Sequence, residues 1–134
     1  MHHAAEVARQ LLEIKAVKLS PRDPFTWASG ILSPIYCDNR VALSYPAVRT
    51  FLKNCLAEQA GSFGPFDVVA GVATAGIAHG ALLADKLDQP FVYVRGSAKD
   101  HGRRNLIEGE IHAQQRVLVI EDLISTGGSC ITAA

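Results

Sequence analysis

The sequence lacks several features that would each indicate a particular class of protein. Its 13 basic and 13 acidic residues cancel, so no charge excess favours nucleic acid or an anionic membrane as a partner. No apolar run has the length of a membrane span, and no secretory signal, low-complexity tract or internal repeat is recognisable. Neither G-x-x-x-x-G-K-S/T nor G-x-G-x-x-G occurs. Any anion-binding site must therefore be local.

Cysteine is also scarce. Cys37, Cys55 and Cys130 are odd in number, widely spaced and mostly in apolar surroundings, which predicts reduced, buried thiols in a cytoplasmic protein rather than a disulfide framework. Their spacing does not indicate a metal site. What the chain does have is 134 residues with 49% hydrophobic content, enough for one packed domain with a modest core.

Apolar periodicity predicts an α/β fold. The expected elements are helices over 3–16, 44–60 and 73–87 and buried strands over 67–72, 91–94 and 117–120. This β-α-β succession implies a parallel sheet with right-handed crossovers. Ser44 is expected to cap the second helix, with Pro46 in its first turn.

An aromatic segment separates the first two helices. Phe25-Thr26-Trp27 and Pro34-Ile35-Tyr36-Cys37 are short β-prone runs around Ser29-Gly30, consistent with a hairpin-like lobe. Its aromatic side chains are either a flat cover for a planar ring or the small core of the lobe itself. The sequence leaves both interpretations open.

Residues 117–129 are the most informative stretch. The apolar strand runs into two adjacent acids, Glu121 and Asp122, and then into a turn rich in hydroxyls and glycine. Ligands bind at the carboxyl ends of strands in open α/β sheets, and small residues before a helix N-terminus suit a phosphate. The carboxylates suit sugar hydroxyls or a developing cation, so this order predicts a ribose 5-phosphate site. The simpler alternative is a buried strand followed by a solvated acidic turn.

Residues 97–115 interrupt the periodic pattern. This polar segment carries Lys99, His101, Arg103 and Arg104, with Arg95 at its base, and a loop of this length is usually functional or disordered. A solvated basic loop is one interpretation. A mobile lid that clamps a polyanion is favoured, because the flanking strands should both end near the predicted phosphate site.

Together these segments resemble the type I phosphoribosyltransferases, and among them orotate phosphoribosyltransferase. Residues 117–129 resemble the motif that binds phosphoribosyl diphosphate (PRPP). Segments 25–40, 71–77 and 95–102 resemble the N-terminal lobe, the second phosphate-side loop and the catalytic loop. The implied fold is a parallel sheet flanked by helices in a single domain. In it, residues 1–40 form the N-terminal helix and a hood-like lobe, and residues 41–134 form the α/β core.

The resemblance implies that the 5-phosphoribosyl group is transferred from PRPP to orotate, in pyrimidine nucleotide synthesis. Arg95, Lys99 and His101 would bind the diphosphate, and Glu121 and Asp122 the ribose hydroxyls; Lys99 and the two acids are the catalytic candidates. The remaining contacts to PRPP would come from Leu123, Ile124, Ser125, Thr126, Gly127, Gly128 and Ser129. Ser125, Tyr36 and Cys37 would contact orotate.

The resemblance also implies Mg²⁺, chelated largely by substrate oxygens rather than by a protein cluster, and a homodimer whose lid is shared between subunits. Four positions depart from the family pattern: Ala28, Leu32, Ala75 and Gly96 stand where basic residues are common, which concerns individual anion contacts. The family extends past residue 134, so we expect a fragment or truncated product with an exposed apolar edge at strand 117–120. Non-catalytic PRPP or nucleotide binding and transfer to another base, such as a purine, remain alternatives.

Overall fold

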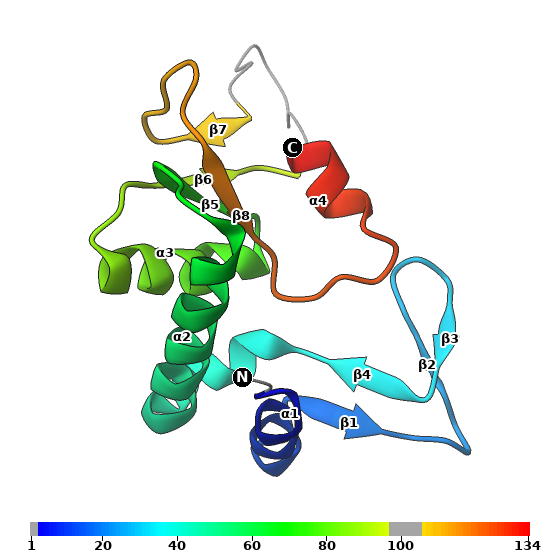
Figure 1. Ribbon diagram of the computed structural model, residues 1–134. Helices are drawn as coiled ribbons and strands as arrows, with labels where there is room; N and C mark the ends of the chain where they lie inside the picture. Colours follow the sequence, from blue (N-terminus) through cyan, green and yellow to red (C-terminus); the bar gives the residue numbers. More distant parts are fainter. Residues whose placement is uncertain (1–2, 97–105) are drawn as a thin grey trace. The chain divides into compact units, whose positions relative to one another are not determined.

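The computed structural model describes residues 3–96 and 106–134. The chain divides into two compact units, an N-terminal unit over Met1–Leu52 and a C-terminal unit over Lys53–Ala134. Helix α2 (Pro46–Ala60) begins in the first unit and ends in the second (Figure 1). Each unit is described by itself.

The N-terminal unit contains one helix and four short strands before α2. They are α1 (Ala4–Glu13), β1 (Val17–Leu19), β2 (Phe25–Thr26), β3 (Leu32–Ser33) and β4 (Ile35–Cys37). Strand β2 pairs with β3 as an antiparallel hairpin, and β4 pairs with β1. The predicted hairpin-like lobe is therefore present, but its second β-prone run pairs with a strand that the periodicity did not reveal. The core of this unit is formed by Leu11, Ala16 and Ala42.

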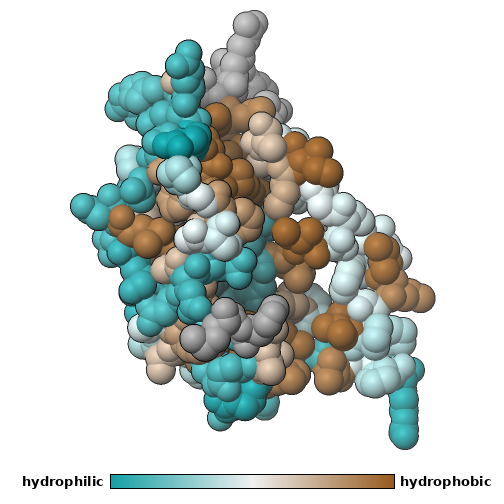
Figure 2. All heavy atoms as spheres, in the orientation of Figure 1, coloured by the Kyte–Doolittle hydropathy of each residue, from teal (hydrophilic) through white to brown (hydrophobic). Residues whose placement is uncertain are grey.

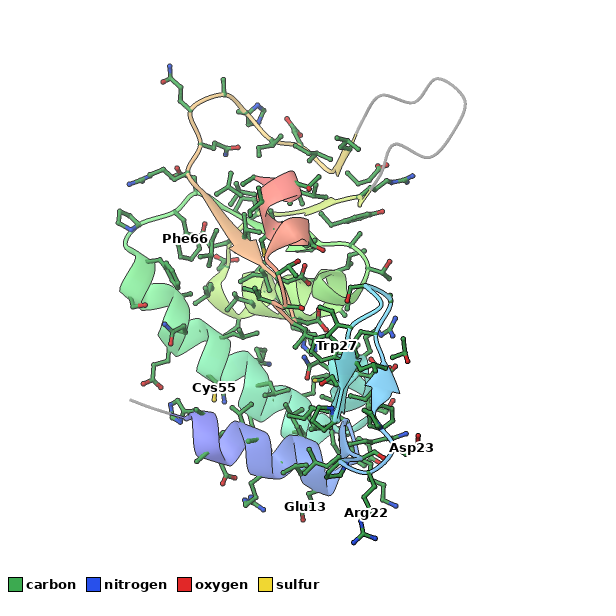
Figure 3. The ribbon with its side chains drawn as sticks, turned by 90° about the vertical axis from the view of Figure 1, so that its right-hand side faces the viewer. Glu13, Arg22, Asp23, Trp27, Cys55 and Phe66 are labelled. Carbon is green, nitrogen blue, oxygen red and sulfur yellow. The ribbon has the colours of Figure 1, made fainter. Side chains whose placement is uncertain are left out.

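The lobe aromatics lie outside that buried core. The rings of Phe25 and Tyr36 pack with centroids 5.6 Å apart, and Tyr36 remains 40% exposed. The indole N–H of Trp27 donates to the carbonyl oxygen of Ile35 at 2.9 Å (Figure 3). These contacts fix the lobe internally while leaving an aromatic side chain accessible.

The predicted cap of α2 is wrong. Residues Asn39–Ser44 form a 3₁₀ helix, η1, which Asp38 opens by accepting from the backbone N–H of Arg40. Because Ser44 is the last residue of that helix, Tyr45 precedes α2 instead, and its carbonyl oxygen accepts from Arg49. Pro46 is the first helical residue, as predicted.

The C-terminal unit is built on a sheet with the strand order β7-β6-β5-β8, as far as the structure describes it. Strands β5 (Val68–Val72), β6 (Phe91–Val94) and β8 (Val117–Ile120) are parallel, which confirms the predicted parallel sheet. Strand β7 (Ile107–Glu108) pairs antiparallel with β6 and lies within the segment predicted to be a loop. The helical elements are η2 (Gly61–Phe63), α3 (Ala75–Leu87) and α4 (Gly128–Ala133).

Both faces of this sheet are covered, which is why its central strand is apolar throughout. On one face, Val69 and Ile120 pack with Leu83 of α3 and Leu56 of α2. On the other face the buried residues are Val68, Ala70, Val92 and Val94. Ala133 of α4 packs against them, and so does Ile111, which lies between β7 and β8. Figure 1 shows α3 and α4 on opposite sides of the strands.

Glycines bring α3 into backbone contact with the sheet. A β-carbon at Gly71 would lie 2.6 Å from the carbonyl oxygen of Gly76, and one at Gly76 would lie 2.7 Å from the carbonyl oxygen of Ile120. Real β-carbons do not approach backbone this closely. The seam formed by Gly71 and Gly76 therefore requires glycine, and it fixes the first turn of α3 beside the end of β8.

Apolar side chains also reach the surface of both units (Figure 2). In the C-terminal unit the most exposed are Ile131, Phe63 and Ile124, at 75%, 69% and 66%. None of the helices in the described ranges combines the length and apolar character that a membrane crossing requires.

Candidate functional site

The candidate site lies where three parallel strands end. The register pairs Gly71 with Ile120 and Val72 with Val94, so the carboxyl ends of β5, β6 and β8 share one edge of the sheet. The chain leaves this edge at Ala73 after β5, at Arg95 after β6 and at Glu121 after β8. This is the edge at which open α/β sheets bind ligands.

The turn after β8 encloses a small cavity of about 100 Å³. Its lining consists of Glu121, Leu123, Ile124, Ser125, Thr126, Gly127, Gly128, Ser129 and Cys130. Gly127 has φ +82°, a left-handed conformation that glycine adopts without strain. Seven of the residues predicted to contact PRPP after the acid pair thus surround one hollow.

A second cavity, of about 250 Å³, lies between the ends of β5 and β6 and helix α4. It is lined by Val72, Ala73, Arg95, Gly96, Gly128, Ser129, Thr132 and Ala133. Gly128 and Ser129 line both cavities, so the two hollows adjoin at the start of α4. Arg95 lines the larger one, and the hydroxyl-bearing turn lines the smaller one.

Arg95 is held at the second cavity by a residue that the sequence analysis did not single out. Its Nη2 lies 2.8 Å from Oε1 of Glu108 in β7. Sequence reasoning missed Glu108 because β7 is a two-residue strand defined by pairing with β6 rather than by periodicity.

The acid pair has an unusual protonation behaviour. Burial, together with the neighbouring Asp122, raises the pKa of Glu121 from 4.5 to about 7. The backbone N–H of Asp122 donates to Oε1 of Glu121 at 3.0 Å. The sequence analysis treated both acids as carboxylates, whereas this pKa makes Glu121 partly protonated near neutral pH.

We expect Glu121→Gln to remove a pH dependence of stability. Between about pH 4.5 and pH 7 the folded chain keeps the Glu121 proton that the unfolded chain releases, so the unfolding free energy falls as pH rises through this window. At pH 8 the unfolding free energy of the variant should exceed that of the wild type by about 1 kcal/mol after allowance for solvent screening. At pH 4 the two unfolding free energies should be equal. Denaturant titrations at both pH values measure this.

Asp85→Asn is the control, because Asp85 is an exposed residue of α3 on the same unit and its replacement should leave the pH profile unchanged. A wild-type profile that is flat from pH 4 to pH 8 would contradict the assignment.

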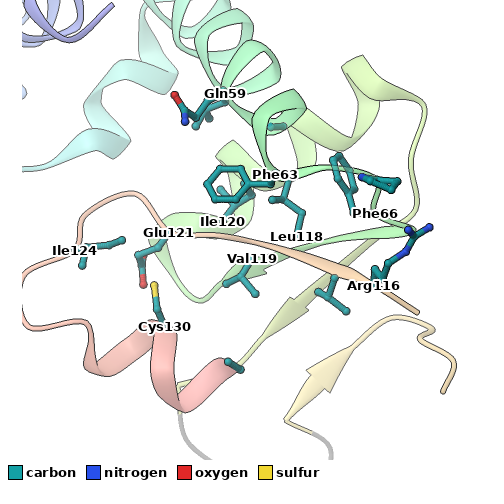
Figure 4. A pocket seen from close by; sticks show the side chains of 15 residues that line it. Gln59, Phe63, Phe66, Arg116, Leu118, Val119, Ile120, Glu121, Ile124 and Cys130 are labelled. Atoms are coloured by element: carbon teal, nitrogen blue, oxygen red, sulfur yellow. The ribbon is translucent and has the colours of Figure 1, made fainter. Parts of the chain in front are cut away.

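A third cavity, of about 790 Å³, runs along the open edge of β8 and is mostly apolar. Leu56, Phe63 and Phe66 line it together with the whole of β8, as Figure 4 shows. Among the predicted site residues that the structure describes, Glu121 and Ile124 line it. An apolar lining does not suit a phosphate, although Glu121, Ile124 and Cys130 line both this hollow and the 100 Å³ cavity.

Cys130 stands next to the acid pair. In Figure 4 its thiol and the Glu121 carboxyl group point toward each other. Burial first, and the nearby Glu121 charge second, raise the pKa of Cys130 above its usual range. A thiol that stays protonated is a poor nucleophile, which agrees with the interpretation of Cys130 as a packing residue.

The predicted contacts also include residues of the N-terminal unit and of the segment after Gly96. Tyr36 and Cys37 lie on β4 in the N-terminal unit. Lys99 and His101, with Arg103 and Arg104, lie outside the described residues. Within residues 3–96 and 106–134, no group of three or more His, Cys, Asp or Glu side chains could hold a metal ion.

Comparison with known proteins identifies the class. The phosphoribosyl transferase domain model matches residues 41–134, which include every strand and helix of the C-terminal sheet unit. The chain therefore belongs to the phosphoribosyltransferase family.

Several of the relatives that it matches are named orotate phosphoribosyltransferase. The enzyme of that name from Listeria monocytogenes is 63% identical over 129 residues, covering 96% of this chain and 62% of the relative. The crystal structure of orotate phosphoribosyltransferase from Aeropyrum pernix matches with a TM-score of 0.78 and 30% identity, covering 95% of this chain and 70% of that one. The crystal structure of the Mycobacterium tuberculosis enzyme in complex with PRPP matches with a TM-score of 0.68 and 25% identity, covering 96% of this chain and 70% of that one. The chain thus spans just over three fifths of the length of such curated relatives.

Proposed function

We propose that this protein transfers the 5-phosphoribosyl group from PRPP to orotate, giving orotidine 5′-monophosphate and diphosphate. The observation that carries the proposal is the pair of adjoining cavities at the carboxyl ends of β5, β6 and β8, one with Arg95 and one with the hydroxyl-rich turn. The similarity to orotate phosphoribosyltransferases supports the choice of acceptor.

We assign the two ends of PRPP to the two cavities. The 100 Å³ turn cavity receives the 5-phosphate, because backbone N–H groups and the hydroxyls of Ser125, Thr126 and Ser129 are donors for phosphate oxygens. The 250 Å³ cavity receives the diphosphate, because Arg95 offers a guanidinium there. Lys99 and His101 are assigned to the diphosphate by family resemblance.

The acids fit the sugar between these two groups. Displacement of diphosphate builds positive charge on the ribose ring, which a carboxylate at Asp122 stabilises. A protonated Glu121 can donate a hydrogen bond to a ribose hydroxyl, and its charged form can accept one. Arg95 and Lys99 balance the negative charge that grows on the leaving group. No covalent nucleophile is required.

Mg²⁺ fits this site only as a metal held mainly by substrate. Magnesium is typically bound through one or two carboxylates together with substrate phosphates. Glu121, which lines the turn cavity, and its chain neighbour Asp122 are the candidate carboxylates. When bound, the ion would neutralise charge on the diphosphate.

The further parts of the proposal concern the acceptor, the assembly and the compartment. Ser125, together with Tyr36 and Cys37 of the N-terminal unit, is assigned to orotate. We propose one domain, with a lobe over 1–40 and a core over 41–134, that works as a homodimer sharing the segment after Arg95. Free thiols at Cys37, Cys55 and Cys130 support a cytoplasmic location.

A turnover assay tests the proposal. Orotate absorbance should fall when the chain is mixed with PRPP, Mg²⁺ and orotate, and it should stay constant when PRPP is omitted. A panel of purine bases checks acceptor choice. Saturable PRPP binding by calorimetry without turnover would assign a binding function alone, and the absence of both binding and turnover would reject the phosphoribosyl site.

A further inference from the structure

The ladder between β6 and β7 places an acid beside the candidate diphosphate cavity. Tyr93 is opposite Glu108 and Val94 is opposite Ile107. The pairing continues past the strands, because the backbone N–H of Arg95 donates to the carbonyl oxygen of Leu106 at 2.7 Å. The residue that leaves β6 toward the cavity is therefore fixed by β7.

Glu108 and Arg95 meet on one face of this ladder. Side chains two residues apart on a strand point to the same face, so Arg95 shares the face of Tyr93 and lies diagonally across from Glu108. Diagonal neighbours are within reach of long side chains. The ion pair at 2.8 Å uses Nη2 of Arg95 and Oε1 of Glu108.

The backbone after Glu108 is also constrained. Gly109 has φ +111°, and a β-carbon there would lie 2.9 Å from Cγ1 of Val92. Any other residue would be strained in this conformation and would collide with the core of the sheet. Strand β7 thus packs closely against β6, so the backbone that carries Glu108 has a fixed position beside Arg95.

We infer that Glu108 is a positioning residue, which holds the guanidinium of Arg95 at the mouth of the 250 Å³ cavity for the diphosphate of PRPP. This rests on the proposed function. One Arg95 nitrogen is engaged by Glu108, and the other guanidinium donors remain for a bidentate contact to phosphate oxygens. Because arginine loses rotamer freedom on binding a ligand, a side chain that is already oriented binds at lower entropic cost.

The test compares variants in binding and in steady-state kinetics. Glu108→Ala should raise the KM for PRPP and the Kd for Mg²⁺-diphosphate about three- to fivefold while leaving kcat within about twofold. Glu108→Gln keeps an acceptor oxygen for Arg95 and should stay within about twofold of the wild type. Glu110→Ala is the matched control, since Glu110 pairs with His112 rather than with Arg95.

A double-mutant cycle separates positioning from a general structural effect. In an Arg95→Ala background, Glu108→Ala should cause no further loss, because its partner is already absent. An equal loss in both backgrounds would overturn the inference, and so would unchanged or tighter binding by Glu108→Ala alone. A wild-type chain that binds neither PRPP nor diphosphate would overturn the proposed function and this role of Arg95 together. Wild-type binding with an unaffected Glu108→Ala variant would overturn the positioning alone.

Discussion

Asp122→Asn is expected to slow phosphoribosyl transfer thirtyfold or more, a loss of about 2 kcal/mol or more in transition-state stabilisation. Asparagine has nearly the shape of aspartate but lacks the charge that opposes the developing cation on the ribose. The backbone N–H that donates to Glu121 is retained, while the loss of the Asp122 charge also removes one of the causes that raise the pKa of Glu121. Initial rates of orotate consumption over a range of PRPP concentrations measure it.

Asp85→Asn is the control for this experiment, because Asp85 is an exposed residue of α3 and the same chemical change there should leave the rate unaltered. The loss at Asp122 should appear mainly in kcat, since the charge acts on the transition state rather than on ground-state binding. Full activity of Asp122→Asn would remove the carboxylate from the mechanism.

Gly71→Ala is expected to lower the unfolding free energy by about 2–3 kcal/mol. The added β-carbon would lie 2.6 Å from the carbonyl oxygen of Gly76 and 3.1 Å from Cα of Ile77. Both obstacles are backbone, so no side-chain rotation relieves the overlap and α3 must move away from β5. For a chain of this size we expect a melting temperature lower by roughly 10 °C, which thermal unfolding followed by circular dichroism measures.

Gly61→Ala is the matched control, because nothing lies within 4 Å of a β-carbon at Gly61 and its φ is not positive. Alanine there should change stability little or raise it slightly, by restricting the unfolded chain. If Gly71→Ala were as stable as Gly61→Ala, the close approach of α3 to the sheet would be refuted.

The main strands of the C-terminal sheet were predictable because burial on both faces leaves a plain signal. Val68–Val72 is apolar throughout, and every residue of it is buried. Val117–Ile120 is also apolar, but the prediction that it is a buried strand was wrong for most of its length: it lies at the sheet edge, Val117 is 39% exposed and Ile120 is its one buried residue. The same strand thus carries both the prediction of the fold and that of the candidate site.

What the sequence did not reveal depends on contacts between distant segments. Strand β7 exists through its pairing with β6, and its two residues are too few to show alternation. The 3₁₀ helix Asn39–Ser44 begins with a local interaction of Asp38 with Arg40, which displaced the predicted cap at Ser44. The raised pKa of Glu121 follows from burial, a property of the folded chain that spacing cannot report.

The seam of glycines between α3 and the sheet has a consequence for how this protein can vary. Because Gly76 meets the carbonyl of Ile120 with no side chain between them, no rotamer is available to absorb a displacement of the helix. A shift in the first turn of α3 would therefore move the Ile120–Glu121 peptide by a similar amount. Sequence drift should therefore be uneven around this helix, permissive on its solvent side and nearly frozen along the line that touches the strands.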